Sequence, residues 1–221
     1  MEKFEWLNAG DIPLLPAKAV CVGRNYREHA AELNNAVPDS PMLFIKPSSS
    51  FVAFKGQIPL AQRLGDHHYE AELALLIGQT IGAATELNLQ QQIAGIGVAM
   101  DLTLRDMQTE LKSKGHPWEK AKAYDNSCIV SPFIEVTDQT DFNNLGFTLA
   151  INNDERQAGK TSEMVFSIAQ LVDEIRQYFT LVPGDIVLTG TPKGVGKLNT
   201  GDRLAVALEK NTLASGQIIL V

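Results

Sequence analysis

The chain of 221 residues has little cysteine and no long hydrophobic run. Its two cysteines, Cys21 and Cys128, lie far apart outside any CxxC pair, which excludes a zinc knuckle and a redox motif and favours a place in the core. No apolar stretch approaches the roughly 18–20 residues of a membrane span. The N-terminus lacks the basic region and apolar core of a secretory signal. We therefore expect a cytoplasmic protein with reduced thiols and no membrane partner.

Basic residues are also scarce, because 19 Lys and Arg stand against 26 Asp and Glu and give a formal net charge of −7. A nucleic-acid partner needs a basic face, so this balance argues against one. The composition, 44% hydrophobic and 20% charged, is ordinary for a globular protein. No repeat, low-complexity tract or Pro/Gly/Ser-rich linker divides the chain.

Short apolar runs bounded by turn residues predict many strands. These strands are expected at 19–22, 42–45, 70–77, 95–103, 186–189, 204–208 and 217–221, with a hairpin of 147–151 and 155–158. Helices are expected at 25–33, 104–114 and 167–179. In the last of them Ser167 and Gln170 fit a capping box. Many short strands with scattered helices indicate a β-rich α+β fold.

Acidic residues interrupt two strands whose pattern otherwise predicts burial. Glu70 and Glu72 share one face of the strand 70–77 because side chains alternate along a strand. Two carboxylates about 4–6 Å apart on a buried face repel by a few kcal/mol at moderate dielectric, and a cation removes that cost. Asp101 follows a second apolar run. Three carboxylates without a thiolate favour Mg²⁺, Mn²⁺ or Ca²⁺ over zinc.

Each of these acids also has a simpler interpretation. The face that carries Glu70 and Glu72 could be exposed to solvent, since Glu-x-Glu is common in strands. Asp101 could cap the helix that follows it. The sequence alone leaves both interpretations open beside the metal site.

Familiar nucleotide and metal motifs fail on spacing. Gly190 precedes Gly196 by six residues rather than five, and Leu198 stands where a phosphate loop needs Ser or Thr. The Gly-rich stretch could still approach a small anion, or be a plain turn. His67 and His68 would face opposite ways in a strand, which argues against a shared metal site.

Several segments together resemble the fumarylacetoacetate hydrolase family, in its short single-domain branch of acylpyruvases and oxaloacetate-processing enzymes. The matching segments are 22–26 with His29 and Glu32, 43–47, 68–72, 101–108, 117–122 and 184–196. The resemblance runs from about Lys18 to the C-terminus, which leaves 1–17 as an N-terminal segment before a single catalytic domain, 18–221. It implies a mixed β-sandwich or β-roll of the family's C-terminal-domain type, and a homodimer.

The resemblance also implies a role for nine residues. As metal ligands it implies Glu70, Glu72 and Asp101, holding one Mg²⁺ or Mn²⁺. As substrate-binding residues it implies Arg105, Gln108 and Thr191. As catalytic residues it implies Lys122 beside the metal, and His29 with Glu32 on a mobile lid. Without the resemblance, Lys122 fits a surface lysine in a charged run, and His29 with Glu32 fits an exposed ion pair on one helix face.

The family's substrates are small anionic 2-oxo acids with a second carbonyl or carboxylate, such as acylpyruvates and oxaloacetate. We expect metal-dependent hydrolysis of the C–C bond of acylpyruvates through an enolate, with His29 activating water. Decarboxylation or keto–enol tautomerisation of oxaloacetate could use the same site, and a non-catalytic binding protein is the alternative of another class. An acidic protein must create local positive potential for such substrates, and the metal, Lys122 and Arg105 are the expected sources.

Overall fold

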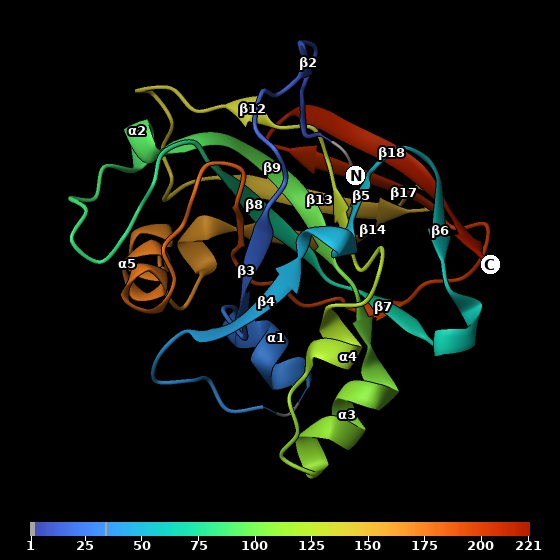
Figure 1. Ribbon diagram of the computed structural model, residues 1–221. Coiled ribbons are helices and arrows are strands. Elements are labelled where there is room, and N and C mark those ends of the chain that lie inside the picture. Colours follow the sequence, from blue (N-terminus) through green and yellow to red (C-terminus); the bar gives the residue numbers. More distant parts are fainter. Residues whose placement is uncertain (1–2, 34) are drawn as a thin grey trace.

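The computed structural model describes residues 3–33 and 35–221, and in this part the strands form sheets of eight, five, three and two strands (Figure 1). The largest sheet has the order β4 (Met42–Pro47), β3 (Lys18–Gly23), β15 (Ile186–Leu188), β8 (Ala71–Ile77), β9 (Ile93–Asp101), β11 (Cys128–Val130) and β5 (Phe51–Ala53), with β12 (Ile134–Glu135) also on β9. The five-stranded sheet has the order β14 (Asp154–Lys160), β13 (Gly146–Ile151), β17 (Arg203–Leu208), β18 (Asn211–Leu220) and β6 (Gly56–Leu60). The small sheets join β10 (Thr103–Leu104), β7 (His67–Tyr69) and β16 (Gly196–Lys197), and β1 (Glu5–Trp6) with β2 (Gly10–Asp11).

Helices are short and connect these sheets. They are α1 (Arg27–Glu32), α2 (Leu89–Gln92), α3 (Arg105–Ser113), α4 (Glu119–Lys122) and α5 (Ile168–Tyr178), with 3-10 turns at Ser48–Ser50, Gln62–Leu64 and Thr161–Glu163. The predicted capping box is present, because the Ser167 side chain accepts from the Gln170 N–H and the Gln170 side chain accepts from the Ser167 N–H. No helix in the described ranges is both long and apolar enough to cross a membrane.

The predicted β-rich α+β fold is confirmed, and both large sheets mix parallel with antiparallel pairs. Several predicted boundaries differ from the observed ones, and two strands show why. The strand expected at 217–221 begins at Asn211. Its first half was missed because polar residues on its exposed side interrupt the apolar pattern. The strand expected from residue 95 ends at Asp101, and Thr103–Leu104 pairs in another sheet.

Strand β8 is buried along its whole length because its two faces contact different clusters of apolar side chains. Leu73 and Leu75 pack in a core shared with α5 and the five-stranded sheet. Ala74 and Leu76 pack on the other face, in a second core that includes Phe4 and Ile12 near the N-terminus. A strand covered on both sides is continuously apolar, and a carboxylate on it is therefore conspicuous.

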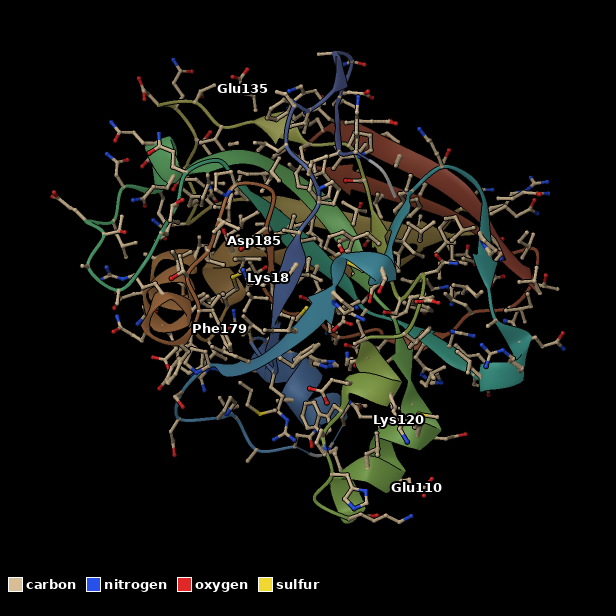
Figure 2. The ribbon with its side chains drawn as sticks, in the orientation of Figure 1. Lys18, Glu110, Lys120, Glu135, Phe179 and Asp185 are labelled. Carbon is tan, nitrogen blue, oxygen red and sulfur yellow. The ribbon has the colours of Figure 1, made fainter. Side chains whose placement is uncertain are left out.

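A buried aspartate fixes the turn that leads into β15. Asp185 accepts hydrogen bonds from the N–H of Lys18 at 3.1 Å and of Val182 at 2.8 Å, and forms an ion pair with the Lys18 side chain (Figure 2). Gly184 has φ +92°, and a Cβ there would lie 2.0 Å from the Leu15 carbonyl oxygen, so only glycine fits. The turn sets the position of β15 and of the Gly-rich loop that follows it.

Candidate active site

The pairing of β8 with β9 brings three acids together. Ala71 lies opposite Met100, so Glu70 lies opposite Asp101, and the Asp101 N–H donates to the Glu70 carbonyl at 2.8 Å. Glu72 is two residues further along β8 on the same face. One carboxylate oxygen from each of the three acids lies within 4.8 Å of the other two.

Burial excludes the two simpler interpretations of these acids. Glu70, Glu72 and Asp101 are 5%, 2% and 1% exposed, so their face is not turned to solvent. Helix α3 begins after Leu104 without a side-chain cap, so Asp101 does not cap it.

Three basic groups surround the acids. Lys122 Nζ lies 2.7 Å from both Glu70 Oε2 and Asp101 Oδ2, and its burial excludes a surface lysine. The Arg105 guanidinium pairs with Glu70 Oε1, and Lys46 Nζ, fully buried in β4, lies 2.8 Å from Asp101 Oδ1. Lys46 was not predicted as a site residue, although a lysine directly after the apolar run 42–45 was a weak signal for it.

The basic groups bring the pKa of one glutamate below normal but not that of the other. Burial alone would raise the pKa of Glu70, but Lys122 and Arg105 outweigh burial and hold it well below its usual range. Burial would lower the pKa of Lys122, but Asp101 and Glu70 raise it above the ordinary lysine value. For Glu72, burial and then the charge of Asp101 raise the pKa well above normal, although the Gly190 N–H donates to Glu72 Oε2 at 2.7 Å.

The donor set fits a hard divalent cation. The acids supply carboxylate oxygens only, which Mg²⁺ and Mn²⁺ prefer. Asp101 Oδ1 is buried and accepts no hydrogen bond from the described residues, despite its ion pair with Lys46. Burial and the charge of Asp101 raise the pKa of Glu72, so its ionised form is also poorly compensated. A cation among these oxygens would meet both deficits.

The expected pair of His29 and Glu32 lies at the edge of the same pocket. His29 Nδ1 is 3.4 Å from Glu32 Oε2, and Glu32 Oε1 accepts from the Gly194 N–H at 3.0 Å, which ties α1 to the Gly-rich loop. His29 is 5% exposed, so it is not part of an exposed ion pair. Burial lowers its pKa, and Glu70 and Glu32 offset this effect only in part.

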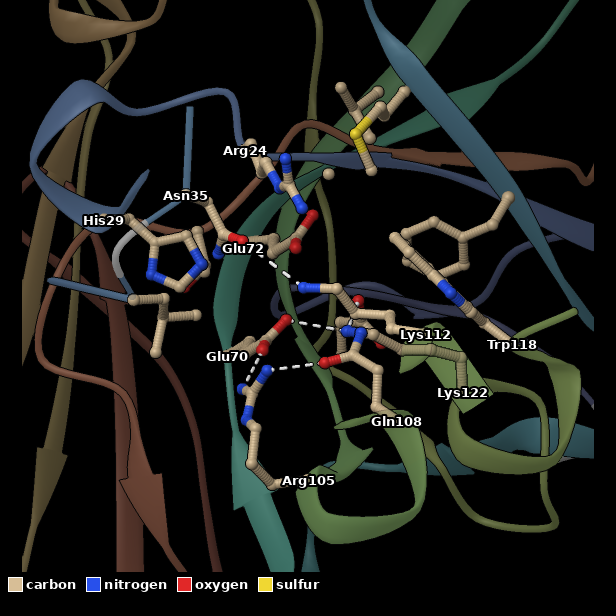
Figure 3. Close-up of a pocket in the computed structure, with 17 residues that line it drawn as sticks. Arg24, His29, Asn35, Glu70, Glu72, Arg105, Gln108, Lys112, Trp118 and Lys122 are labelled. Carbon is tan, nitrogen blue, oxygen red and sulfur yellow. Dashed lines mark hydrogen bonds and ion pairs between the residues drawn. The ribbon is translucent and has the colours of Figure 1, made fainter. Parts of the chain in front are cut away.

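One pocket contains eight of the nine expected site residues (Figure 3). Those lining it are His29, Glu70, Glu72, Asp101, Arg105, Gln108, Lys122 and Thr191. Glu32 does not line the pocket and contacts it through His29. Arg24 and Lys112 also line it and were not expected from the sequence.

Gln157 is a further residue that the sequence did not reveal. It is buried in β14, where its side-chain oxygen accepts from the Ala71 N–H at 2.8 Å, between the two glutamates. Its Nε2 donates to Thr191 Oγ1 at 2.8 Å and to the Pro192 carbonyl at 2.9 Å. Gln157 thus joins the acidic strand to the Gly-rich loop.

The fold and the pocket define a strand-rich α+β protein with a buried acidic site that could hold a divalent cation. The chain belongs to the fumarylacetoacetate hydrolase family: the family model described as fumarylacetoacetate (FAA) hydrolase C-terminal matches residues 18–218. It is 46% identical over 206 residues to oxaloacetate tautomerase YcgM of Escherichia coli (strain K12), covering 93% of both chains. It is 38% identical over 189 residues to the mitochondrial oxaloacetate tautomerase FAHD1 of Homo sapiens, covering 86% of both.

A solved structure is similar to this fold over nearly the whole chain. The fumarylpyruvate hydrolase from Pseudomonas aeruginosa, in complex with Mn²⁺ and pyruvate, matches with a TM-score of 0.88 and 29% identity, covering 98% of this chain and 95% of that one.

Proposed function

We propose that this protein catalyses the keto–enol tautomerisation of oxaloacetate with a divalent cation held by Glu70, Glu72 and Asp101. The observation that carries the proposal is the 46% identity, over 93% of both chains, with an oxaloacetate tautomerase. The sequence alone favoured hydrolysis of acylpyruvates and gave oxaloacetate as the alternative. The pocket geometry serves both reactions and so does not distinguish them. The similarity to oxaloacetate tautomerases therefore decides in favour of the alternative.

The charges of the pocket suit an anionic substrate. The three carboxylates are opposed by three cations, Lys46, Arg105 and Lys122. A divalent cation would leave this group with a net positive charge, and Arg24 and Lys112 line the same pocket, so an anion such as oxaloacetate is favoured. Such a cation supplies Lewis-acid stabilisation of an oxygen that becomes negatively charged, worth several kcal/mol.

His29 is suited to move the proton. Conversion of the keto form to the enol takes a proton from C3 and places one on the oxygen of C2. His29 lines the pocket, and its lowered pKa keeps the imidazole neutral near pH 7, so it can accept the C3 proton and, as the imidazolium, deliver a proton to the C2 oxygen. Glu32 beside Nδ1 favours the tautomer with the proton on Nδ1 and leaves Nε2 as the base.

Lys122 serves as a fixed positive charge. Its amine donates to both Glu70 and Asp101, and its raised pKa keeps it protonated, so it is not a base. A preorganised charge of this kind stabilises a developing oxyanion without reorganisation.

We expect two neutral side chains of the pocket to donate to a substrate carboxylate. Thr191 Oγ1 accepts from Gln157 Nε2, and its hydroxyl donates to the Pro192 carbonyl only at 3.5 Å, a long contact that a ligand oxygen would replace. Gln108 Oε1 accepts from Arg105 Nη1 at 2.8 Å, which fixes the amide and leaves its NH₂ group free to donate.

Hydrolysis of acylpyruvates remains a second candidate. It is favoured by the similarity to a fumarylpyruvate hydrolase and by the His29–Glu32 pair, which could activate a water molecule.

The test follows the decay of enol absorbance after dilution of enol-rich oxaloacetate. Metal-stripped protein should be inactive, and Mg²⁺ or Mn²⁺ should restore activity. His29→Gln should lower the rate by about 10²- to 10⁴-fold. Parallel assays measure pyruvate release from oxaloacetate and cleavage of acetylpyruvate. Cleavage of acetylpyruvate without faster tautomerisation would reject the proposal in favour of the hydrolase.

A further inference from the structure

The pocket contains two basic residues, Arg24 and Lys112, that no carboxylate of the described chain neutralises. Lys122 and Arg105, which the sequence offered as sources of positive potential, are instead held by Glu70 and Asp101. Their charges therefore serve to balance the acids. Besides the divalent cation, the positive charge that no acid balances in this pocket comes from Arg24 and Lys112.

Arg24 and Lys112 come from distant parts of the chain to the same part of this pocket. Arg24 follows β3, and Lys112 lies in the last turn of α3. Burial and then the charges of Arg24 and Arg105 lower the pKa of Lys112, so the two unpaired cations lie within each other's field. Figure 3 shows both side chains turned toward the acidic residues, next to Asn35, whose Oδ1 lies 3.3 Å from Lys112 Nζ.

The backbone at Arg24 adds an independent observation. Its φ of +60° lies in the left-handed region, which disfavours a residue with a long side chain. No hydrogen bond from Arg24 to the described residues compensates for the cost of this backbone conformation. A strained residue whose charge is also unpaired fits a ligand-binding role better than a structural one.

We propose that Arg24 and Lys112 bind the second carboxylate of a four-carbon 2-oxo dicarboxylate and so select dicarboxylates over 2-oxo monocarboxylates. The inference rests on the proposed function, since oxaloacetate belongs to this class. The first carboxylate and the 2-oxo group take the acidic, cation-holding side of the pocket. The second carboxylate then meets a guanidinium, which can bind it with two parallel hydrogen bonds, and an ammonium that adds a point charge.

The experiment compares two stable, unreactive ligands that differ in the second carboxylate. Malate and lactate are both 2-hydroxy acids, and calorimetry of Mg²⁺-saturated protein measures their dissociation constants. The wild type should bind malate at least about 10-fold more tightly, as expected for a charge-assisted contact. Arg24→Gln should weaken malate binding by about 10- to 100-fold. Lys112→Met, at a more exposed residue, should weaken it by about 3- to 10-fold.

Lactate binding should change by less than about twofold in both variants. Lys114→Met is the matched control, because it removes the same charge two residues away, outside the pocket. Arg24→Lys keeps the charge and should retain part of the preference for malate. An equal loss of malate and lactate binding in Arg24→Gln, or unchanged malate binding in both variants, would overturn the inference.

The outcome separates this inference from the proposed function. A wild type that prefers malate through Arg24 but does not tautomerise oxaloacetate would reject the tautomerase and keep the carboxylate site. A protein that tautomerises oxaloacetate but binds malate no more tightly than lactate would reject the carboxylate site and keep the tautomerase.

Discussion

Replacing Lys46 with methionine tests whether the acids of the site need their buried cations. Lys46 Nζ lies 2.8 Å from Asp101 Oδ1 and donates to the carbonyls of Leu102 at 3.2 Å and Ser127 at 3.1 Å. It also donates to the carbonyl of Lys122. Methionine keeps the length of the side chain but offers no donor and no charge.

The expected loss is large for one substitution. Breaking a buried ion pair costs about 3–5 kcal/mol, because one charge is left without compensation. The carbonyls that lose their donor place Lys46→Met toward the upper end of that range. Domains are stable by only about 5–15 kcal/mol. At about 2–4 °C per kcal/mol for a chain of this size, the Tm should fall by about 6–20 °C.

A divalent cation should reduce this loss. Without Lys46 the three acids are opposed by Lys122 and Arg105 alone, so added Mg²⁺ enters a more negative site. Urea unfolding followed by circular dichroism, with and without Mg²⁺, should show a larger stabilisation by Mg²⁺ in the variant than in the wild type. Lys55→Met is the matched control, since Lys55 is exposed and paired with Glu5 at the surface. We expect it to change stability by less than about 1 kcal/mol.

Two outcomes would refute this reasoning. One is a Lys46→Met variant that unfolds within about 1 kcal/mol of the wild type in the absence of metal, which would mean that Asp101 does not depend on this partner. The other is an equal effect of Mg²⁺ on both proteins, which would place the bound cation away from Asp101.

Protonation of His29, burial of the two cysteines and the contact of Gln157 with Thr191 each have a measurable consequence. Burial lowers the pKa of His29 below 6.5, so the acid limb of the kcat/KM profile should lie below that pH and disappear in His29→Gln. The same shift affects the free energy of unfolding: the contribution of the neutral imidazole is fully present above pH 6.5 and falls as the pH drops toward the lower, folded-state pKa. Burial raises the pKa of Cys21 well above normal and that of Cys128 to about 12, so a disulfide reagent at about pH 8 should label neither thiol until urea unfolds the chain. Gln157→Leu should raise KM for oxaloacetate but add little in a Thr191→Val background, because both changes remove the same oriented hydroxyl; additive effects would contradict this.

The sequence predicted the parts of the site that depend on local pattern. Alternation along a strand placed Glu70 and Glu72 on one face, and an acid at the end of an apolar run marked Asp101. Their convergence depends on the antiparallel register of β8 and β9, which pairs Ala71 with Met100. Local pattern does not determine the register between two separate strands, so the family resemblance supplied that step.

Residues that act through tertiary contacts gave weaker signals. Gln157 is one of two buried residues in an otherwise exposed strand, and its role depends on Ala71, 86 residues away. Lys46 reaches Leu102 across 56 residues. Each satisfies polar groups that only the folded chain brings near it, so the apolar run before Lys46 was a weak signal and no pattern in the sequence identified Gln157.

The pocket contains two kinds of cation, and they should differ in what their removal changes. Lys46 and Lys122 are buried and paired with acids, so their charges compensate those of the acids in the fold. Arg24 and Lys112 are unpaired and at least partly exposed, so they contribute little to folding and remain available to a ligand. Substitutions in the first pair should therefore lower unfolding free energy in the absence of any ligand. Substitutions in the second pair should leave that free energy nearly unchanged and weaken dicarboxylate binding, so denaturation and calorimetry on the same variants can tell the two kinds apart.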